Sequence, residues 1–400
     1  MTHRLYLDNP YLREIDSRIV DKIYKDGKYY IKLNRTIFYP HLSGGQPGDK
    51  GTINGVQVLE VYEEDGDIIH VTKENIYSDK VILNIDWENR FDNMQQHTGQ
   101  HLLSAAFYKL YNGETIGFHI GKDFVYIDIT LPDLSEDDAE KIEIYANRII
   151  SSNFEIKSYY IEKNDINKIP VRKKPTVNSN IRIVEIDNID FSPCAGTHLR
   201  NTGEIGMIKI RKWEKYKGNI RIEFVCGNRA LFDYRWKSKM IKDIAILLSS
   251  KDTDVLEKVK ILYNQKEDLE KNNRTLQEEL IRYKSEDLLR NSIKIDDLLF
   301  ITKIFDDKNL KEINKISIFL NNISNSIQIF GAKYENKGQF LISVSKDLNI
   351  NLKDVLQEIS EEFEIKGGGS SQTVQGRCSL DDLDKLLNAF FENVKNKAKD

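Results

Sequence analysis

Four residues with metal-binding side chains occur as two pairs of equal spacing, His97 with His101 and Cys194 with His198. In a helix, side chains four residues apart project from one face about one turn apart, so both members of a pair can reach one ion. Three imidazoles and one thiolate form a ligand set that suits zinc. The chain has seven histidines and three cysteines, and this set uses four of those ten residues. We therefore expect one zinc ion per chain.

The role of such an ion stays open at this stage. Thr98 follows His97 at the position where zinc peptidases of the H-E-x-x-H type carry their general-base glutamate, which disfavours a peptidase. Four protein ligands are typical of a structural zinc, whereas a catalytic zinc keeps a position for water. The residues alone leave the structural and the catalytic ion equally open. Cys226, at the end of a predicted strand, is expected to be a buried structural thiol.

A glycine-rich segment is the second feature with binding chemistry. Residues 43–51 read SGGQPGDKG and contain Gly44, Gly45 and Gln46. Glycines let backbone amides approach a ligand closely, and a glutamine side chain can hydrogen-bond a base edge or a sugar. The segment lacks the G-K-[ST] ending of a Walker motif. A cluster of β-turns is the simpler interpretation, and the same alternatives apply to the glycine turn predicted in KGGGSSQTVQGR at 366–377.

Basic residues gather in one predicted hairpin, although the net charge of the chain is −4. Six Lys and Arg side chains occur from Lys209 to Arg221 with a single acid, and two aromatic residues are interleaved with them. Basic groups neutralise phosphates and aromatic rings stack on bases, so Arg211, Lys212 and Lys215 are candidate RNA contacts. A solvated hairpin without a ligand is the alternative.

These residues are distributed over a chain whose patterns predict an α+β protein of several domains. Residues 1–90 contain short strands separated by turns, which favours a small β-barrel. Residues 91–230 combine an amphipathic helix that carries His97 and His101 with a second helix capped by Ser135 and with strands on either side of Cys194. We expect this block to be the zinc-binding domain.

The rest of the chain is predicted to be a spacer followed by a small domain. Residues 231–292 contain neither proline nor glycine, and apolar residues recur every seven positions at Val255, Leu262, Leu269, Leu276 and Tyr283. This pattern predicts a long helix or helical hairpin, coiled-coil-like in character. Residues 293–400 are predicted to form an α/β unit. A homodimer through the spacer or this unit is one expectation, and a spacer that packs on its own chain is the other.

Composition limits the remaining classes. A length of 400 residues predicts two to four domains. Three cysteines are too few for a disulfide framework. The chain has no apolar run of about 18 residues and its N-terminus is polar, so we expect neither a membrane span nor a signal peptide, and a cytoplasmic location.

In this order, the motifs resemble the alanyl-tRNA editing proteins called AlaX, and equally the editing domain of alanyl-tRNA synthetase. The resemblance rests on TIFYPHLSGGQPGDKG, NMQQHTGQHLLSAAF, ETIGFHIGKDFVYIDI and CAGTHLRNTGEIGMIKIRKW, and it covers residues 5 to 234. The spacer and the C-terminal unit are similar, more loosely, to the C-terminal region of the synthetase and of long-form AlaX proteins. The synthetase's aminoacylation domain has no counterpart, so the resemblance implies no tRNA charging.

The resemblance assigns roles to individual residues. It implies that His97, His101, Cys194 and His198 hold zinc beside the aminoacyl ester, and that Gln46 and its glycines lie near the terminal adenosine. His119 would order water or substrate, and Thr115 would contact a serine hydroxyl. The implied activity is hydrolysis, in trans, of Ser-tRNA(Ala), with Gly-tRNA(Ala) as a second candidate substrate. The alternatives are a non-catalytic RNA-binding protein with a structural zinc and a zinc hydrolase of another ester.

Overall fold

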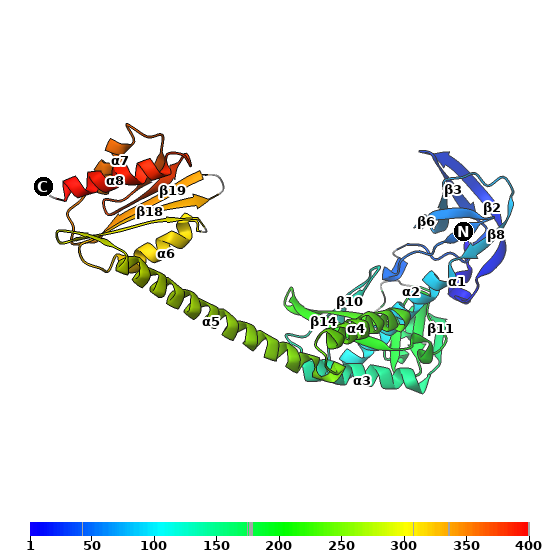
Figure 1. The fold of residues 1–400 in the computed structure, drawn as a ribbon. Coiled ribbons are helices and arrows are strands. Elements are labelled where there is room, and N and C mark those ends of the chain that lie inside the picture. The colour runs from blue at the N-terminus through cyan, green and yellow to red at the C-terminus, as the bar shows by residue number, and fades with distance from the viewer. Residues whose placement is uncertain (42, 174, 176–178, 307, 335–336, 399–400) are drawn as a thin grey trace. The chain divides into compact units, whose positions relative to one another are not determined.

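The computed structural model describes residues 1–41, 43–173, 175, 179–306, 308–334 and 337–398 (Figure 1). The chain divides into two compact units, Met1–Leu247 and Leu248–Asp400. Both contain helices and strands, so the α+β class predicted from the sequence is confirmed. None of the described helices is long and apolar enough to span a bilayer.

The first unit begins with a closed barrel of six strands, which leaves no unpaired edge. Their order around the barrel is β2 (Glu14–Lys25), β3 (Lys28–Leu33), β7 (Asp67–Thr72), β6 (Val56–Glu64), β5 (Gly51–Ile53) and β8 (Lys80–Ile85). Alternate apolar residues point inward, as Ile31 and Leu33 do on β3, where both are fully buried. The short helix α1 (Leu5–Asp8) and the parallel pair β1 (His3–Arg4) and β4 (Arg35–Thr36) accompany the barrel.

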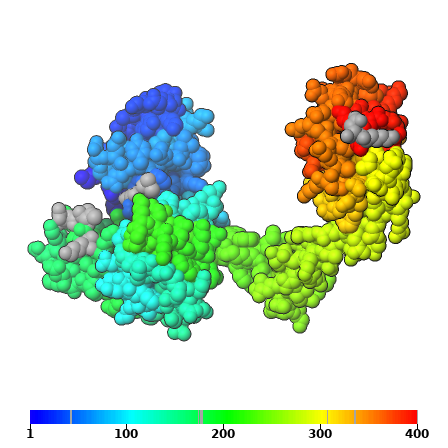
Figure 2. Space-filling view, turned by 90° about the vertical axis from the view of Figure 1, so that its left-hand side faces the viewer, coloured from blue at the N-terminus to red at the C-terminus, as the bar shows by residue number. Residues whose placement is uncertain are grey.

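The remainder of the first unit is built around α2 (Trp87–Tyr111), a 25-residue helix that begins at the N-cap Asp86. A four-stranded sheet packs against it in the order β14 (Ile208–Tyr216), β15 (Asn219–Cys226), β10 (Val125–Ile129) and β9 (Thr115–Ile120). A three-stranded sheet follows the order β11 (Ile156–Ile161), β12 (Ile181–Ile186) and β13 (Asp190–Pro193). Helix α3 (Glu136–Ser152) is capped by Ser135, as predicted. In Figure 2 the barrel, in blue, lies directly against this cyan and green body.

A buried ion pair fixes the barrel against α2. Arg90 on α2 is fully buried, and its guanidinium binds both carboxylate oxygens of Asp49, which lies two residues before the start of β5. The same guanidinium donates to the carbonyls of Pro10, at 2.8 Å, and Ile37, at 2.6 Å. Because a buried charge is costly unless it is paired and hydrogen-bonded, this set of contacts leaves little freedom between the glycine-rich segment and α2.

Close packing explains why Gly99 and Cys226 occur where α2 meets β15. A Cβ atom at Gly99 would overlap Sγ of Cys226, so the glycine allows α2 to lie against the end of β15. Cys226 is fully buried, and burial raises the pKa of its thiol. This environment agrees with the structural role predicted for it.

The predicted spacer contains two helices. Helix α4 (Gly227–Leu247) ends the first unit, and α5 (Val255–Arg290) begins after a break that contains Ser249 in the left-handed region and the turn η4 (Asp252–Asp254). The heptad residues of α5 remain exposed: Leu262, Leu269, Leu276 and Tyr283. Within the described residues, no element therefore covers this apolar stripe.

The second unit contains a six-stranded sheet in the order β16 (Ile293–Ile295), β17 (Leu298–Phe305), β18 (Ser326–Tyr334), β19 (Lys337–Val344), β21 (Thr373–Cys378) and β20 (Lys366–Gly369). Helices α6 (Leu310–Leu320), α7 (Leu352–Ile359) and α8 (Leu383–Lys397) pack on it. Within the segment 366–377, where a glycine turn is predicted, Lys366–Gly369 is an edge strand, and the chain turns after it, before β21. Gly367 and Gly369 lie so close to the backbone of β21 that a Cβ atom at either would overlap it.

Candidate metal centre

The structure brings together the two pairs that the sequence singled out. His97 and His101 lie on α2, and Cys194 and His198 lie in the loop that follows β13. The four ligand atoms are all within 4.8 Å of one another. Nε2 of His97 lies 3.5 Å, and Nε2 of His198 3.3 Å, from Sγ of Cys194. A tetrahedral zinc with bonds of about 2.0 Å to nitrogen and 2.3 Å to sulfur would hold these atoms about 3.5 Å apart. The donor set therefore fits one zinc ion.

Each imidazole has an oxygen beside its second ring nitrogen. Nδ1 of His97 lies 2.9 Å from Oε1 of Gln46, Nδ1 of His198 lies 3.2 Å from Oγ1 of Thr98, and Nδ1 of His101 lies 3.3 Å from a carboxylate oxygen of Asp190. Partners of this kind fix the tautomer and the ring orientation of metal-binding histidines. Thr98, which stands where a peptidase would have its glutamate, thus orients His198.

Asp190 belongs to a buried network that supports His101. Its carboxylate accepts hydrogen bonds from Arg172 at 2.9 Å and Ser192 at 2.8 Å. Burial opposes its charged form, but His101 and Arg172 outweigh burial and lower the pKa of Asp190 to about 2. Burial likewise opposes the thiolate of Cys194, yet the neighbouring His97 and His198 hold the pKa of the thiol well below its usual value. The centre is thus prepared to present a thiolate, the form that binds metal.

Gln46 has a different position from the one expected. It is fully buried, its Nε2 donates to Oγ1 of Thr197 at 2.8 Å, and its Oε1 is shared by His97 and the backbone N–H of Thr197. Because the amide is fully buried and both its oxygen and its nitrogen have partners within the protein, it is not exposed to a base edge or a sugar. Gln46 therefore positions His97 and the C-x-x-x-H loop from behind the ion site.

The two glycines beside Gln46 fit closely against the site. Gly44 and Gly45 have φ of +67° and +81°, in a backbone region that residues other than glycine rarely adopt. A Cβ atom at Gly45 would come within 2.9 Å of the Phe118 ring, which in turn stacks on His97. Gly44 lines the cavity described next. Leu42, in the same motif, lies outside the described residues.

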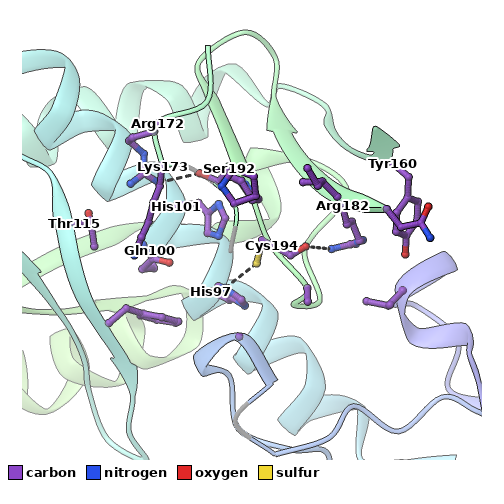
Figure 3. Close-up of a pocket in the computed structure, with 18 of the residues that line it drawn as sticks. His97, Gln100, His101, Thr115, Tyr160, Arg172, Lys173, Arg182, Ser192 and Cys194 are labelled. Atoms are coloured by element: carbon purple, nitrogen blue, oxygen red, sulfur yellow. Dashed lines mark hydrogen bonds between the residues drawn. The ribbon is translucent and has the colours of Figure 1, made fainter. Parts of the chain in front are cut away.

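A cavity of about 730 Å³ lies beside the metal-binding residues (Figure 3). His97, His101 and Cys194 form part of its wall, whereas His198 does not. Its charged lining residues are all cationic: Arg4, Arg172, Lys173 and Arg182. No carboxylate of the described residues lines it, so the cavity favours an anionic ligand.

Thr115 and His119 lie on opposite faces of the sheet. The extra residue Ile116 forms a bulge in β9, so Thr115 pairs with Ile129 and Phe118 with Ile127, on the face that packs against α2. Thr115 lines the cavity and donates to Oγ of Ser104 at 2.7 Å. His119 pairs with Tyr126, is exposed, and packs on that ring. The structure does not bring His119 to the metal centre, because the bulge shifts the alternation by one residue.

The basic hairpin formed by β14 and β15 is largely ion-paired. Arg211 lies 3.0 Å from Glu223 and 3.3 Å from Asp233, Lys212 lies 3.4 Å from Glu223, and Lys215 lies 3.8 Å from Asp133. The side chains of Lys212 and Lys215 are 70% and 73% exposed, whereas that of Arg211 is 28% exposed. Of these three candidates, the two lysines are therefore free to exchange their partners for phosphates, and Arg211 is not.

Several site residues were missed by sequence reasoning. They are Thr98, Gln100, Ser104, Tyr160, Arg172, Arg182, Asp190 and Ser192. Gln100 and Ser104 lie on the face of α2 that carries His97, and helical spacing could have indicated them. Thr98 lies on the same helix, next to His97. The others come from β11 to β13 and from Arg172, and no local pattern signals that these segments meet α2.

Comparisons with known proteins agree with this site. Residues 181–223, which include Cys194 and His198, match the family described as the threonyl and alanyl tRNA synthetase second additional domain. The chain is 34% identical over 397 residues to the alanyl-tRNA editing protein AlaX-L of Pyrococcus horikoshii, covering 94% of this chain and 95% of that protein. It is 28% identical to the alanyl-tRNA editing protein Aarsd1 of Danio rerio, with 92% of each covered.

A longer relative differs in extent. The alanine–tRNA ligase of Pyrococcus abyssi is 27% identical to this chain, and the match covers 98% of the chain but only 43% of the ligase. The full-length likeness to the editing proteins, together with the gathered motifs, confirms the resemblance seen in the sequence. The chain belongs to the family of alanyl-tRNA editing proteins.

Proposed function

We propose that this chain hydrolyses, in trans, the ester that links serine to the 3′ end of tRNA(Ala), at one zinc ion held by His97, His101, Cys194 and His198. The observation that carries the proposal is the position of three of these residues in the wall of a cavity that is lined by four Arg and Lys side chains and by no carboxylate of the described residues. An ion held there is within reach of a substrate, which favours a catalytic over a purely structural role.

The chemistry required is modest, because an aminoacyl ester is already activated. When bound, zinc supplies a Lewis acid and lowers the pKa of bound water. The protein's part is to hold the ligands in one geometry and to orient the ester. Gln46, Thr98 and Asp190 perform the first task through the three Nδ1 atoms. The cationic cavity wall, with Thr115 at one end, performs the second.

Discrimination must favour serine over alanine, which lacks only a hydroxyl. A pocket built to hydrogen-bond a hydroxyl rejects an analogue without it far better than a purely apolar pocket can reject an added hydroxyl. Thr115 and Gln100 line the cavity, and both donate to Oγ of Ser104, at 2.7 and 2.8 Å. The hydroxyl hydrogen of Thr115 is thus occupied, and the side-chain oxygens of Thr115 and Gln100 remain as acceptors for the serine hydroxyl. Alanine would leave those oxygens unpaired.

The tRNA body needs contacts outside the cavity. We assign this role to Lys212 and Lys215, since both are well exposed and their ion pairs are of the weak surface kind. We exclude Arg211 from it, because two carboxylates hold its guanidinium.

The first test of the proposal is the choice of substrate. Purified protein should deacylate Ser-tRNA(Ala) and largely spare Ala-tRNA(Ala), by a factor of up to about 10⁴ for a fully hydrogen-bonded pocket. Gly-tRNA(Ala) measured alongside ranks the second candidate. Equal hydrolysis of the serine and alanine esters would refute editing, and hydrolysis of neither would favour an RNA-binding protein with a structural zinc.

A second prediction concerns the ligand set. Elemental analysis should find one zinc per chain, and cobalt-substituted protein should show a thiolate-to-metal charge-transfer band. Cys194→Ser should remove that band, whereas Cys226→Ala, the matched control at the other thiol beside α2, should retain it. A band that depends on Cys226 instead would contradict the assignment.

A third prediction concerns Thr115. Thr115→Val keeps the shape but removes the acceptor, and one buried hydrogen bond is worth about 1–3 kcal/mol. We expect kcat/KM on Ser-tRNA(Ala) to fall about 10- to 100-fold, while the slow rate on Ala-tRNA(Ala) stays the same. Thr275→Val, on an exposed part of α5, is the control. An equal loss on both substrates would mean that Thr115 only supports β9.

A fourth prediction concerns phosphate contacts. Each contact removed from an RNA-binding surface lowers the slope of log K against log salt by about 0.7–0.9. The Lys212→Ala/Lys215→Ala double variant should flatten the slope for tRNA(Ala) accordingly. Lys25→Ala/Lys28→Ala, at a barrel hairpin, should not. An unchanged slope in the first variant would identify the hairpin as a solvated face.

A further inference from the structure

The cavity has a second end, formed by Tyr160 and Arg182. These residues are direct cross-strand partners on β11 and β12, so their side chains project from the same face. Figure 3 shows them on one side of Cys194, with Thr115 and Gln100 on the other. The metal-binding residues therefore lie between a hydroxyl-rich end and an end that combines an aromatic ring with a cation.

Arg182 is unusual among the cations of the cavity. It is only 7% exposed, yet it makes no ion pair with any carboxylate of the described residues. Its Nη1 donates to the carbonyls of Cys194 and Gly196, each at 2.9 Å, and its buried Nε has no acceptor there. By contrast, Arg4 pairs with Glu63 and Arg172 with Asp190. Burying an unpaired charge is costly, so a counter-charge is missing.

The metal centre does not supply that counter-charge. Zinc(II) with one thiolate and three neutral imidazoles carries a net charge of +1. In the loaded protein, Arg182 would therefore stand beside another cation, and the missing anion must come from a ligand. Tyr160, beside it, is 55% exposed and offers a ring face on which a planar group can stack.

We propose that Arg182 binds the phosphodiester that joins the last two nucleotides of the substrate and that Tyr160 stacks on the terminal base. This assignment rests on the proposed function and adds a direction to it. The 3′ end enters over Tyr160 and Arg182, the ester lies at the metal-binding residues, and the amino-acid side chain reaches Thr115. A cation and an aromatic ring side by side are the usual means of holding a single-stranded end.

Three serine esters of increasing size test the proposal on the unmodified, zinc-loaded protein: the ethyl ester, the 3′-ester of adenosine and the 3′-ester of cytidylyl-adenosine. Measured relative to the uncatalysed hydrolysis of each ester, the adenosine ester should exceed the ethyl ester in kcat/KM by about 10-fold or more through stacking. The dinucleotide ester, which alone contains the phosphodiester, should exceed the adenosine ester by a further 10- to 100-fold, roughly the worth of a charged hydrogen bond. Only that second step should weaken as salt is raised.

Variants show which residue causes each increase in kcat/KM. The ratio of kcat/KM between two esters is compared within each variant, because a general loss of activity cancels in that ratio. Arg182→Met should bring the dinucleotide-to-adenosine ratio close to one, and Arg182→Lys should restore much of it. Tyr160→Ala should reduce the adenosine-to-ethyl ratio instead. Arg148→Met, at an exposed position on α3, is the matched control and should change neither ratio.

The outcomes separate this proposal from the function on which it rests. If all three esters are hydrolysed but the adenosine and dinucleotide esters react equally, the role of Arg182 is refuted and editing stands. If Arg182→Met keeps the wild-type ratio, the phosphodiester is bound elsewhere. If none of the three esters nor Ser-tRNA(Ala) is hydrolysed, the proposed function itself fails. If the variants do not fold, the ratio and its salt dependence in the unmodified protein decide.

Discussion

One buried amide oxygen ties the site together. Oε1 of Gln46 is shared by Nδ1 of His97 and by the backbone N–H and hydroxyl of Thr197, so it joins the segment before β5, helix α2 and the C-x-x-x-H loop. A buried polar group left without its partner costs about 1–3 kcal/mol. Moving any one of the three segments would therefore disturb the other two. The arrangement also sets the tautomer of His97, since a proton on Nδ1 leaves Nε2 free to face Cys194.

The distribution of charge is as important as its total. The net charge of −4 suggests no affinity for RNA, yet the cavity wall carries only cations among its charged groups. Glu63 pairs with Arg4 and Asp190 pairs with Arg172, and neither carboxylate lines the cavity. Arg182 has no carboxylate partner in the described part of the chain. Among the described residues, the protein thus keeps one buried cation without a carboxylate partner beside the candidate metal ligands. Elsewhere, carboxylates accompany the basic residues of the β14–β15 hairpin, which reduces the field that its composition suggests.

Local sequence patterns predicted what depends on spacing. The i, i+4 pairs singled out the four candidate metal ligands that the structure brings together, and the cap at Ser135 marked the start of α3. The patterns failed where pairing between distant strands decides the outcome. Because of the bulge at Ile116, His119 lies on the face of the sheet that is turned away from the candidate metal ligands. The glycines at 367–369 form a strand because they pair with β21. Gln46 looked like a ligand contact because its hydrogen-bond partner, Thr197, lies 151 residues away in the chain. The partners of Arg182 were equally invisible for this reason.

Under the proposed function, the ester is hydrolysed at the ion that His97, His101, Cys194 and His198 hold. This claim is tested most directly by single-turnover deacylation of Ser-tRNA(Ala) at several zinc occupancies, prepared by chelation and stepwise reloading, with circular dichroism recorded on each sample. We expect the deacylation rate to rise in proportion to the zinc occupancy, up to one zinc per chain, while the fold is retained. A folded, metal-free chain that hydrolyses the ester at the full rate would contradict it.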